Sequence, residues 1–96
     1  MKTEPDDLLV EVRVPDSLVD GSEPKIRMGL WLLPVGSHLR TGQRLVELTI
    51  GPVSFVIHSP CAGRLVKRLV QEDVVVSNGT LLGVILKDGY DSRPES

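Results

Sequence analysis

Hydrophobic and polar positions alternate over short segments of this chain, and turn residues separate the segments. Val10, Val12 and Val14 alternate with Glu11 and Arg13, which is the two-residue period of a half-buried strand. The other apolar runs are short, rich in Val, Leu and Ile, and separated by Gly, Pro and Asn, which favours strands over long helices. The pattern predicts strands at residues 8–14, 26–33, 45–50, 53–58, 63–70, 74–76 and 81–86.

Polar segments flank the predicted strands and divide the chain. We expect residues 1–7 to be a loose N-terminus, residues 8–87 to form one domain, and residues 88–96 to be a polar tail. Residues 15–25 contain Gly21 and Pro24, which break regular structure, so this segment is predicted to be a surface loop.

The second half of the chain repeats the first at a fixed offset. Gly42 and Gly79, each in a turn signal, are 37 residues apart (79 − 42), and at this offset six apolar pairs coincide: Met28 with Leu65, Leu32 with Leu69, Leu33 with Val70, Leu39 with Val76, Leu45 with Leu82, and Leu48 with Ile85. The alternative is a chance echo in a chain rich in Val and Leu. Two similar units that pack face to face would share one core. The repeat thus predicts an all-β fold, a flattened barrel or sandwich of two antiparallel units related by a pseudo-twofold axis.

Length, charge and composition exclude several classes of function. The 96 residues suffice for one small domain. The net charge of −2 and an aromatic content of 3% argue against nucleic acid as a partner. No segment has the 18 or so apolar residues of a membrane span, and acids stand near the N-terminus where a signal peptide needs an apolar run. The single cysteine permits no internal disulfide, so we expect a reducing, cytoplasmic location.

Candidate chemistry is sparse. His58 and Cys61 are three residues apart on extended chain and are predicted to point to opposite faces, so Cys61 is interpreted as structural. Two histidines without paired thiolates provide no zinc site, and no pair of carboxylates suggests acid–base catalysis. Arg64 and Arg68 are expected to share a strand face with Lys67 on the other. We therefore expect no catalytic residues, no metal and no enzymatic activity.

Five short motifs occur in a distinctive order. They are Val14-Pro15-Asp16, Trp31-Leu32 followed by Gly36, the segment GQRLVEL from Gly42 to Leu48, Ser59-Pro60-Cys61-Ala62-Gly63, and Asn78-Gly79 followed by Leu81-Leu82. Together with the internal repeat, this order resembles the biotinyl/lipoyl carrier domain, in particular the lipoyl domains of 2-oxo acid dehydrogenase acyltransferase subunits. The resemblance covers most of the chain and implies the barrel-sandwich hybrid fold.

The resemblance also identifies a departure from the family. Those domains attach lipoate or biotin through an amide to a lysine at a hairpin tip between the two halves. Counting back from Ser59 across the strand at 53–58 places Pro52 at that position. Amide formation needs a free amine, which proline lacks, and no lysine lies between Lys25 and Lys67. We therefore expect no cofactor-binding residue and no cofactor.

The turn itself must differ from that of the family. Proline at the third position of a type I turn is disfavoured, which leaves either a cis Gly51-Pro52 bond in a type VI turn or a shifted turn with Pro52 second. Both give a stiff, apolar tip, comprising Ile50, Gly51, Pro52 and Val53, that suits docking. In the family the early loop lies beside this tip, so Asp20 and Gly21 join the candidate docking surface.

Three functional hypotheses follow. The first is a domain of lipoyl/biotinyl type without the carrier lysine, acting as a non-catalytic structural or protein-docking module with a protein partner such as an enzyme complex. The second is a genuine swinging-arm carrier, with lipoate or biotin on another lysine such as Lys87, near the mirror-image turn. The third is a lipoyl-like domain related to membrane-fusion adaptor proteins, which also lack the lysine. The sequence leaves the oligomeric state open.

Overall fold

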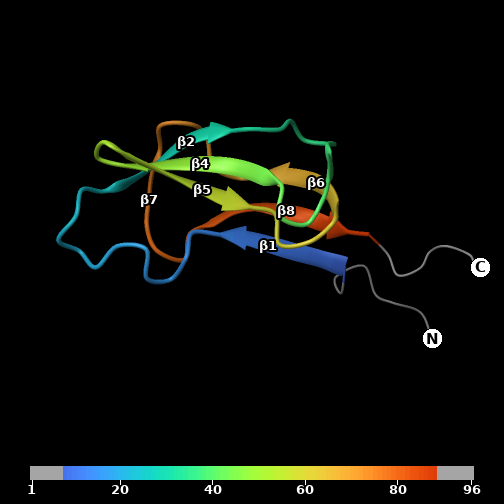
Figure 1. Cartoon of the computed structure of the whole chain (residues 1–96), viewed down its shortest axis with the longest axis horizontal. Coiled ribbons are helices and arrows are strands. Elements are labelled where there is room, and N and C mark those ends of the chain that lie inside the picture. Colours follow the sequence, from blue (N-terminus) through green and yellow to red (C-terminus); the bar gives the residue numbers. More distant parts are fainter. Residues whose placement is uncertain (1–7, 89–96) are drawn as a thin grey trace, which may run out of the picture.

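Eight strands make up the described chain (Figure 1). The computed structural model describes residues 8–88, so the predictions for residues 1–7 and 89–96 lie outside the described residues. The strands are β1 (Leu9–Arg13), β2 (Ile26–Trp31), β3 (His38–Leu39), β4 (Arg44–Ile50), β5 (Val53–His58), β6 (Gly63–Arg68), β7 (Val75–Val76) and β8 (Leu81–Lys87). Of the predicted tail only Asp88 is described, and its N–H donates to the carbonyl of Ala62 at 3.0 Å.

The strands form two four-stranded antiparallel sheets, which confirms the predicted all-β sandwich. One sheet has the order β1-β8-β6-β3 and the other β5-β4-β2-β7. Buried side chains from both sheets form a single core, whose largest fully buried members include Ile26, Met28, Leu45, Leu48, Leu65, Leu82 and Ile85. Within residues 8–88 no helix is long and apolar enough to cross a bilayer.

The predicted repeat is present in the strands and their registers. Adding 37 to the bounds of β2, β3 and β4 gives the bounds of β6, β7 and β8. The pair Met28 and Leu48 corresponds to the pair Leu65 and Ile85. The halves interlock, because β3 pairs with β6 and β7 pairs with β2. The fold is therefore two similar units related by a pseudo-twofold axis.

Strand β1 occupies the place in the second half that β5 has in the first. β5 pairs with β4 in the same register in which β1 pairs with β8. The pair Ser54 and Thr49 corresponds to the pair Leu9 and Leu86, so equivalent residues of β1 and β5 are 45 positions apart (54 − 9). The hairpin that joins β4 to β5 therefore has its counterpart where β8 ends and β1 begins. Figure 1 shows these two places at opposite ends of the molecule.

Most of the predicted strands differ from the observed ones by one or two residues at an end, and two further details differ as well. β3, with only two residues between turns, was not predicted. A bulge between Leu65 and Lys67 shifts the register of β6 against β8. Because of this bulge, Arg64 pairs with Leu86 and Lys67 pairs with Val84. Leu86 and Val84 are two residues apart on one face of β8, so Arg64 and Lys67 lie on the same face of the sheet. The prediction that Arg64 shares a face with Arg68 is therefore wrong.

Trp31 anchors the core at the edge of the sandwich. This residue is 9% exposed, and its Nε1–H donates to the Val70 carbonyl at 2.9 Å. The Arg68 guanidinium lies 5.8 Å from the ring centroid, within cation–π range. Gly83 leaves room for this ring, because a Cβ there would lie 2.8 Å from Trp31 Cη2 and 2.6 Å from the Lys67 carbonyl oxygen.

Candidate functional site

The β4–β5 hairpin ends in a two-residue turn. Ile50 pairs with Val53, so Gly51 and Pro52 are the two central residues. Gly51 has a φ of 59°, and the described residues contain no cis peptide bond. Positive φ at the first central residue followed by the fixed φ of proline is the pattern of a type II′ turn, which suits the twist of hairpin strands.

Both turns expected from the sequence are therefore wrong. The Gly51-Pro52 bond is trans, and Pro52 keeps the third position of the turn. The physical reason lies in Gly51, because a glycine adopts positive φ without steric cost. Gly51 thus leaves the right-handed region, and Pro52 needs neither a cis bond nor a shifted register.

The loop formed by residues 15–25 reaches the hairpin through Pro24. A Cβ added to Gly51 would lie 3.1 Å from Pro24 Cγ, so the Gly51 backbone closely approaches the Pro24 ring at this point. Figure 1 shows the loop and the hairpin tip at the same end of the molecule. Pro24, interpreted from the sequence only as a breaker, is the residue that joins the two segments of the candidate docking surface.

Asp20 and Gly21 lie on the outer part of the loop in a compact polar turn. The Asp20 carboxylate accepts hydrogen bonds from Ser22 Oγ at 2.6 Å and Ser22 N at 3.0 Å, while its own N–H donates to Glu23 Oε1 at 2.9 Å. The hydrogen bonds from Ser22, side chain first and backbone second, lower the pKa of Asp20 to about 2. Gly21 has a φ of 102° with open space around it. This turn is fixed in shape and carries a persistent negative charge.

Asn78 fixes the loop against the second half of the repeat. Its Nδ2 donates to the Val19 carbonyl at 2.7 Å, and its Oδ1 accepts from the Val19 N–H at 3.2 Å. Leu18 and Val19 pack against the core beside this contact. The sequence indicated only a turn at Asn78. At the equivalent position of the first half the repeat has Thr41 (78 − 37). This difference between the two halves is the one sequence signal that Asn78 has a role of its own.

The surface at this end combines an apolar tip with a shallow hollow. Val53 is 58% exposed and Ile50 is half-buried. A hollow of about 270 Å³ lies between the loop and β7, and its lining includes Pro24, Lys25 and Val75. The four tip residues, 50–53, carry no charged side chain and no nucleophile. The tip can make apolar contacts with a partner, and its four residues offer no group for chemistry.

None of the three lysines of the described chain lies in the Gly51-Pro52 turn. Lys25 immediately precedes β2, in the loop beside the hairpin. Lys67 lies within β6 opposite Val84. Lys87 is the exposed last residue of β8 and pairs with Gly63. Figure 1 shows that β8 ends at the opposite end of the molecule from the β4–β5 hairpin.

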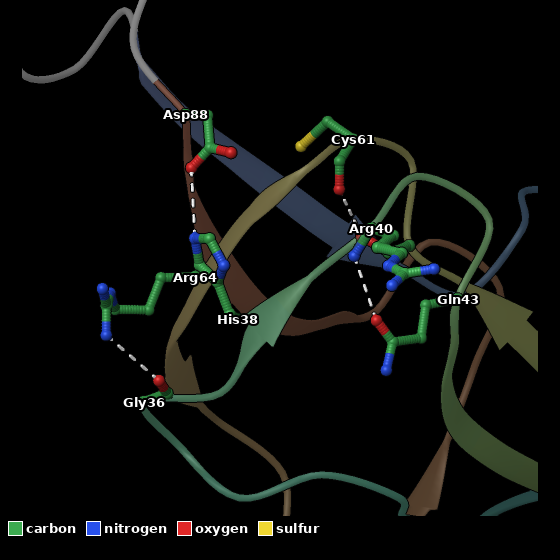
Figure 2. A network of polar contacts seen from close by, with 8 residues as sticks. Gly36, His38, Arg40, Gln43, Cys61, Arg64 and Asp88 are labelled. Atoms are coloured by element: carbon green, nitrogen blue, oxygen red, sulfur yellow. Dashed lines mark hydrogen bonds and ion pairs between the residues drawn. The ribbon is translucent and has the colours of Figure 1, made fainter. Parts of the chain in front are cut away.

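A polar network occupies the end around Lys87. His38 Nε2 lies 3.6 Å from Asp88 Oδ1, and Arg64 Nη1 donates to the Gly36 carbonyl at 3.3 Å (Figure 2). Cys61 is half-buried, and burial raises the pKa of its thiol, with Lys87 opposing and Asp88 adding to the shift. A thiol held in its protonated form is a poor nucleophile. Within residues 8–88 no group of three or more potential ligands could hold a metal ion.

Comparison with known proteins supports the fold alone. No protein-family model matches the sequence, and the search of curated proteins found no significant match. Among solved structures, the chain is similar to part of a single-chain, multi-domain long-chain acyl-CoA carboxylase, with 22% identity and a TM-score of 0.68. The match covers 95% of this chain and 8% of the carboxylase chain. The architecture that the motif order implied is thus found in a solved protein, as one small part of a much longer chain.

Proposed function

We propose that this chain is a domain of biotinyl/lipoyl type that lacks the carrier lysine and acts as a non-catalytic docking module. The observation that carries the proposal is the tip of the β4–β5 hairpin, formed by Gly51 and Pro52. Counting back from Ser59 across the strand at 53–58, the resemblance implies that Pro52 stands where the family has its carrier lysine. None of the four tip residues, 50–53, has a side-chain amine, and without an amine no amide with lipoate or biotin can form.

The form of the turn supports the same conclusion. A carrier needs a side chain that extends from the hairpin, whereas Pro52 has a closed ring and Gly51 packs against Pro24 of the 15–25 loop. The tip is braced by that loop, and Asn78 braces the loop in turn. A rigid surface loses little conformational entropy on binding, which favours docking.

The surface offered to a partner has a definite chemistry. Val53 at the tip and Val75 beside the hollow are both more than 40% exposed. Asp20 carries a negative charge at neutral pH on the outer part of the loop. We propose that the partner is a protein, such as a component of an enzyme complex, that covers the apolar tip.

The acyl-CoA carboxylase similarity fits a module that works within a larger assembly. That carboxylase is a single chain with several domains, and the part that matches this fold is 8% of its length. Binding to an enzyme partner without catalysis of its own is the role that the proposal gives to this chain.

The competing proposal is a carrier modified at Lys87. Lys87 is exposed, and the repeat makes it equivalent to Ile50, which flanks the hairpin tip (87 − 37). Its place is the last residue of a strand, paired with Gly63, and the Gly51-Pro52 turn has no counterpart among the described residues at that end.

Co-expression with a lipoyl ligase or a biotin ligase, followed by intact mass measurement, tests the proposal. We expect the wild-type chain to keep its unmodified mass while a known carrier domain in the same cells gains one cofactor. The Pro52→Lys variant restores an amine at the tip and serves as the matched comparison. A mass gain in the wild-type chain that Lys87→Arg abolishes would establish the competing proposal.

A second experiment tests docking. Once a partner enzyme is identified, its affinity is measured for the wild-type chain and for Val53→Asp, which places a charge on the apolar tip. We expect at least about tenfold weaker binding for Val53→Asp, because a carboxylate would be desolvated without a partner. Leu69→Asp, which makes the same change of character at another exposed hydrophobic residue, is the control and should bind normally. Equal binding by all three chains would remove the tip from the proposed surface.

A further inference from the structure

The outer edge of β5 carries a row of backbone groups that point away from the sheet. Ile50 and Val53 flank a two-residue turn, so they form a hydrogen-bonded pair, and such pairs alternate along an antiparallel ladder. The N–H of Ser59 donates to the Gln43 carbonyl at 2.8 Å. Ser59 therefore points toward the segment that leads into β4, and the alternation continues to the end of β5. The N–H and C=O groups of Ser54, Val56 and His58 therefore face outward.

These outward groups have no partner strand in the described chain. β5 is the last strand of its sheet, with β4 as its one neighbour. Within residues 8–88, no backbone hydrogen bond from another segment reaches the outward groups of Ser54, Val56 or His58. Unpaired edges of this kind are templates for pairing with another strand.

The pseudo-twofold axis provides an internal comparison for this edge. In β1, the equivalent strand, Glu11 and Arg13 stand where β5 has Val56 and His58 (offset 45). Arg13 Nη2 and Glu11 Oε1 lie 2.8 Å apart, so β1 carries an ion pair along its edge, and charge of this kind discourages pairing. β5 has no Lys, Arg, Asp, Glu or Pro between residues 53 and 58. The other two edges, β3 and β7, are two residues long.

We propose that a second copy of this chain pairs with β5 in antiparallel orientation, about a twofold axis at Val56. In this register Val56 faces Val56 of the second copy, and Ser54 faces His58. All six outward groups of each copy then gain a partner. Centring the axis on Ser54 or on His58 would instead bring Pro52 or Pro60 opposite Val56, and proline has no N–H to donate.

The side chains of β5 complement themselves in this register. Phe55 of one copy faces Ile57 of the other on the side turned toward the core, where Phe55 is 36% exposed and Ile57 is half-buried. Aromatic and β-branched side chains stabilise such cross-strand pairs. No two like charges face each other along the strand, because residues 53–58 contain none of the permanently charged residues. A second copy thus matches the edge in hydrogen bonding, shape and charge.

The expected association is weak and depends on concentration. One strand from each copy buries less than the roughly 1,200–2,000 Å² of a stable interface. The inference is independent of the docking proposal, since it uses the outer edge of β5 and leaves the Gly51-Pro52 turn free.

Sedimentation velocity of the full chain over a concentration series provides the first test. We expect a monomer–dimer equilibrium that Val56→Lys weakens by at least about tenfold, because two ammonium groups would face each other across the axis. Val75→Lys makes the same change at an exposed valine on the opposite edge of the sheet and should leave the equilibrium unchanged. A wild-type chain that stays monomeric at millimolar concentration, or a dimer that the folded V56K chain retains, would overturn the proposal.

Cysteine cross-linking tests the register and does not require the V56K chain to fold. In a Cys61→Ala background, Val56→Cys would bring two cysteines together with Cα atoms about 5.5 Å apart, within disulfide range. Ser54→Cys is the matched control, because the two copies of residue 54 would be about 14 Å apart along the paired strands. We expect a disulfide-linked dimer from V56C and little from S54C. Equal cross-linking of the two chains, or none from either, would contradict the proposed register.

Discussion

Removal of the Asn78 side chain tests how the 15–25 loop is held beside the hairpin. Asn78→Ala deletes two hydrogen bonds to Val19, of 2.7 and 3.2 Å. A typical intramolecular hydrogen bond contributes about 0.5–1.5 kcal/mol, so the pair is worth about 1–3 kcal/mol. Because one bond is long and Val19 is only half-buried, water can replace part of the loss. We expect the free energy of unfolding to fall by about 1–2 kcal/mol.

Urea unfolding and amide hydrogen exchange together measure this effect. The Val19 amide should exchange faster in Asn78→Ala, because its acceptor is gone, while amides of β4 and β8 should change only with global stability. Thr41→Ala is the matched control at the equivalent position of the first half, and as an exposed residue it should change stability by less than about 0.5 kcal/mol. Unchanged stability and unchanged Val19 exchange in Asn78→Ala would refute the reasoning.

Three further predictions concern single positions. Gly83→Ala should lower the free energy of unfolding by about 1–3 kcal/mol, because its Cβ would lie 2.8 Å from Trp31 Cη2; chemical denaturation measures this, and wild-type stability would contradict it. Gly51→Ala should cost about 1–2 kcal/mol in the same assay, because an L-residue is strained at a φ of 59°; a stabilised variant would show that the turn differs. The Asp20 carboxyl should titrate by NMR with a pKa of about 2, below the ordinary 3.8, and Ser22→Ala should raise it. Since the folded-state pKa is depressed, the stabilisation from Asp20 is present above about pH 3.8 and is lost as pH falls through about 2.

The architecture was predictable because the hydrophobic pattern repeats. The 37-residue offset paired Met28 with Leu65 and Leu48 with Ile85, and the structure places these residues at equivalent positions of the two sheets. The strand at residues 53–58 was predicted to the residue. A pattern of this kind is strong because each buried face must match another across one core.

Local backbone geometry was predicted less well. The bulge between Leu65 and Lys67 moved Lys67 to the face of Arg64, because one extra residue reverses the alternation that the sequence pattern assumes. At Gly51-Pro52 the restrictions of proline predicted a cis bond or a shifted turn, whereas the positive φ of Gly51 makes both unnecessary. In both cases the outcome depends on a few backbone angles.

The residues that shape the candidate site make contacts between distant segments. Pro24 meets Gly51, and Asn78 binds Val19 at a separation of 59 residues. A turn-forming residue gives no sign in the sequence of which remote backbone its side chain will bind. Such contacts become visible only when the fold has placed the segments side by side.

The most direct test of the central claim is the intact mass of the wild-type chain, purified from cells that supply lipoate, biotin and an active ligase for each. A hairpin tip made of Gly51 and Pro52 predicts a mass equal to that of the unmodified polypeptide. A chain heavier by one lipoyl or one biotinyl group would contradict the account.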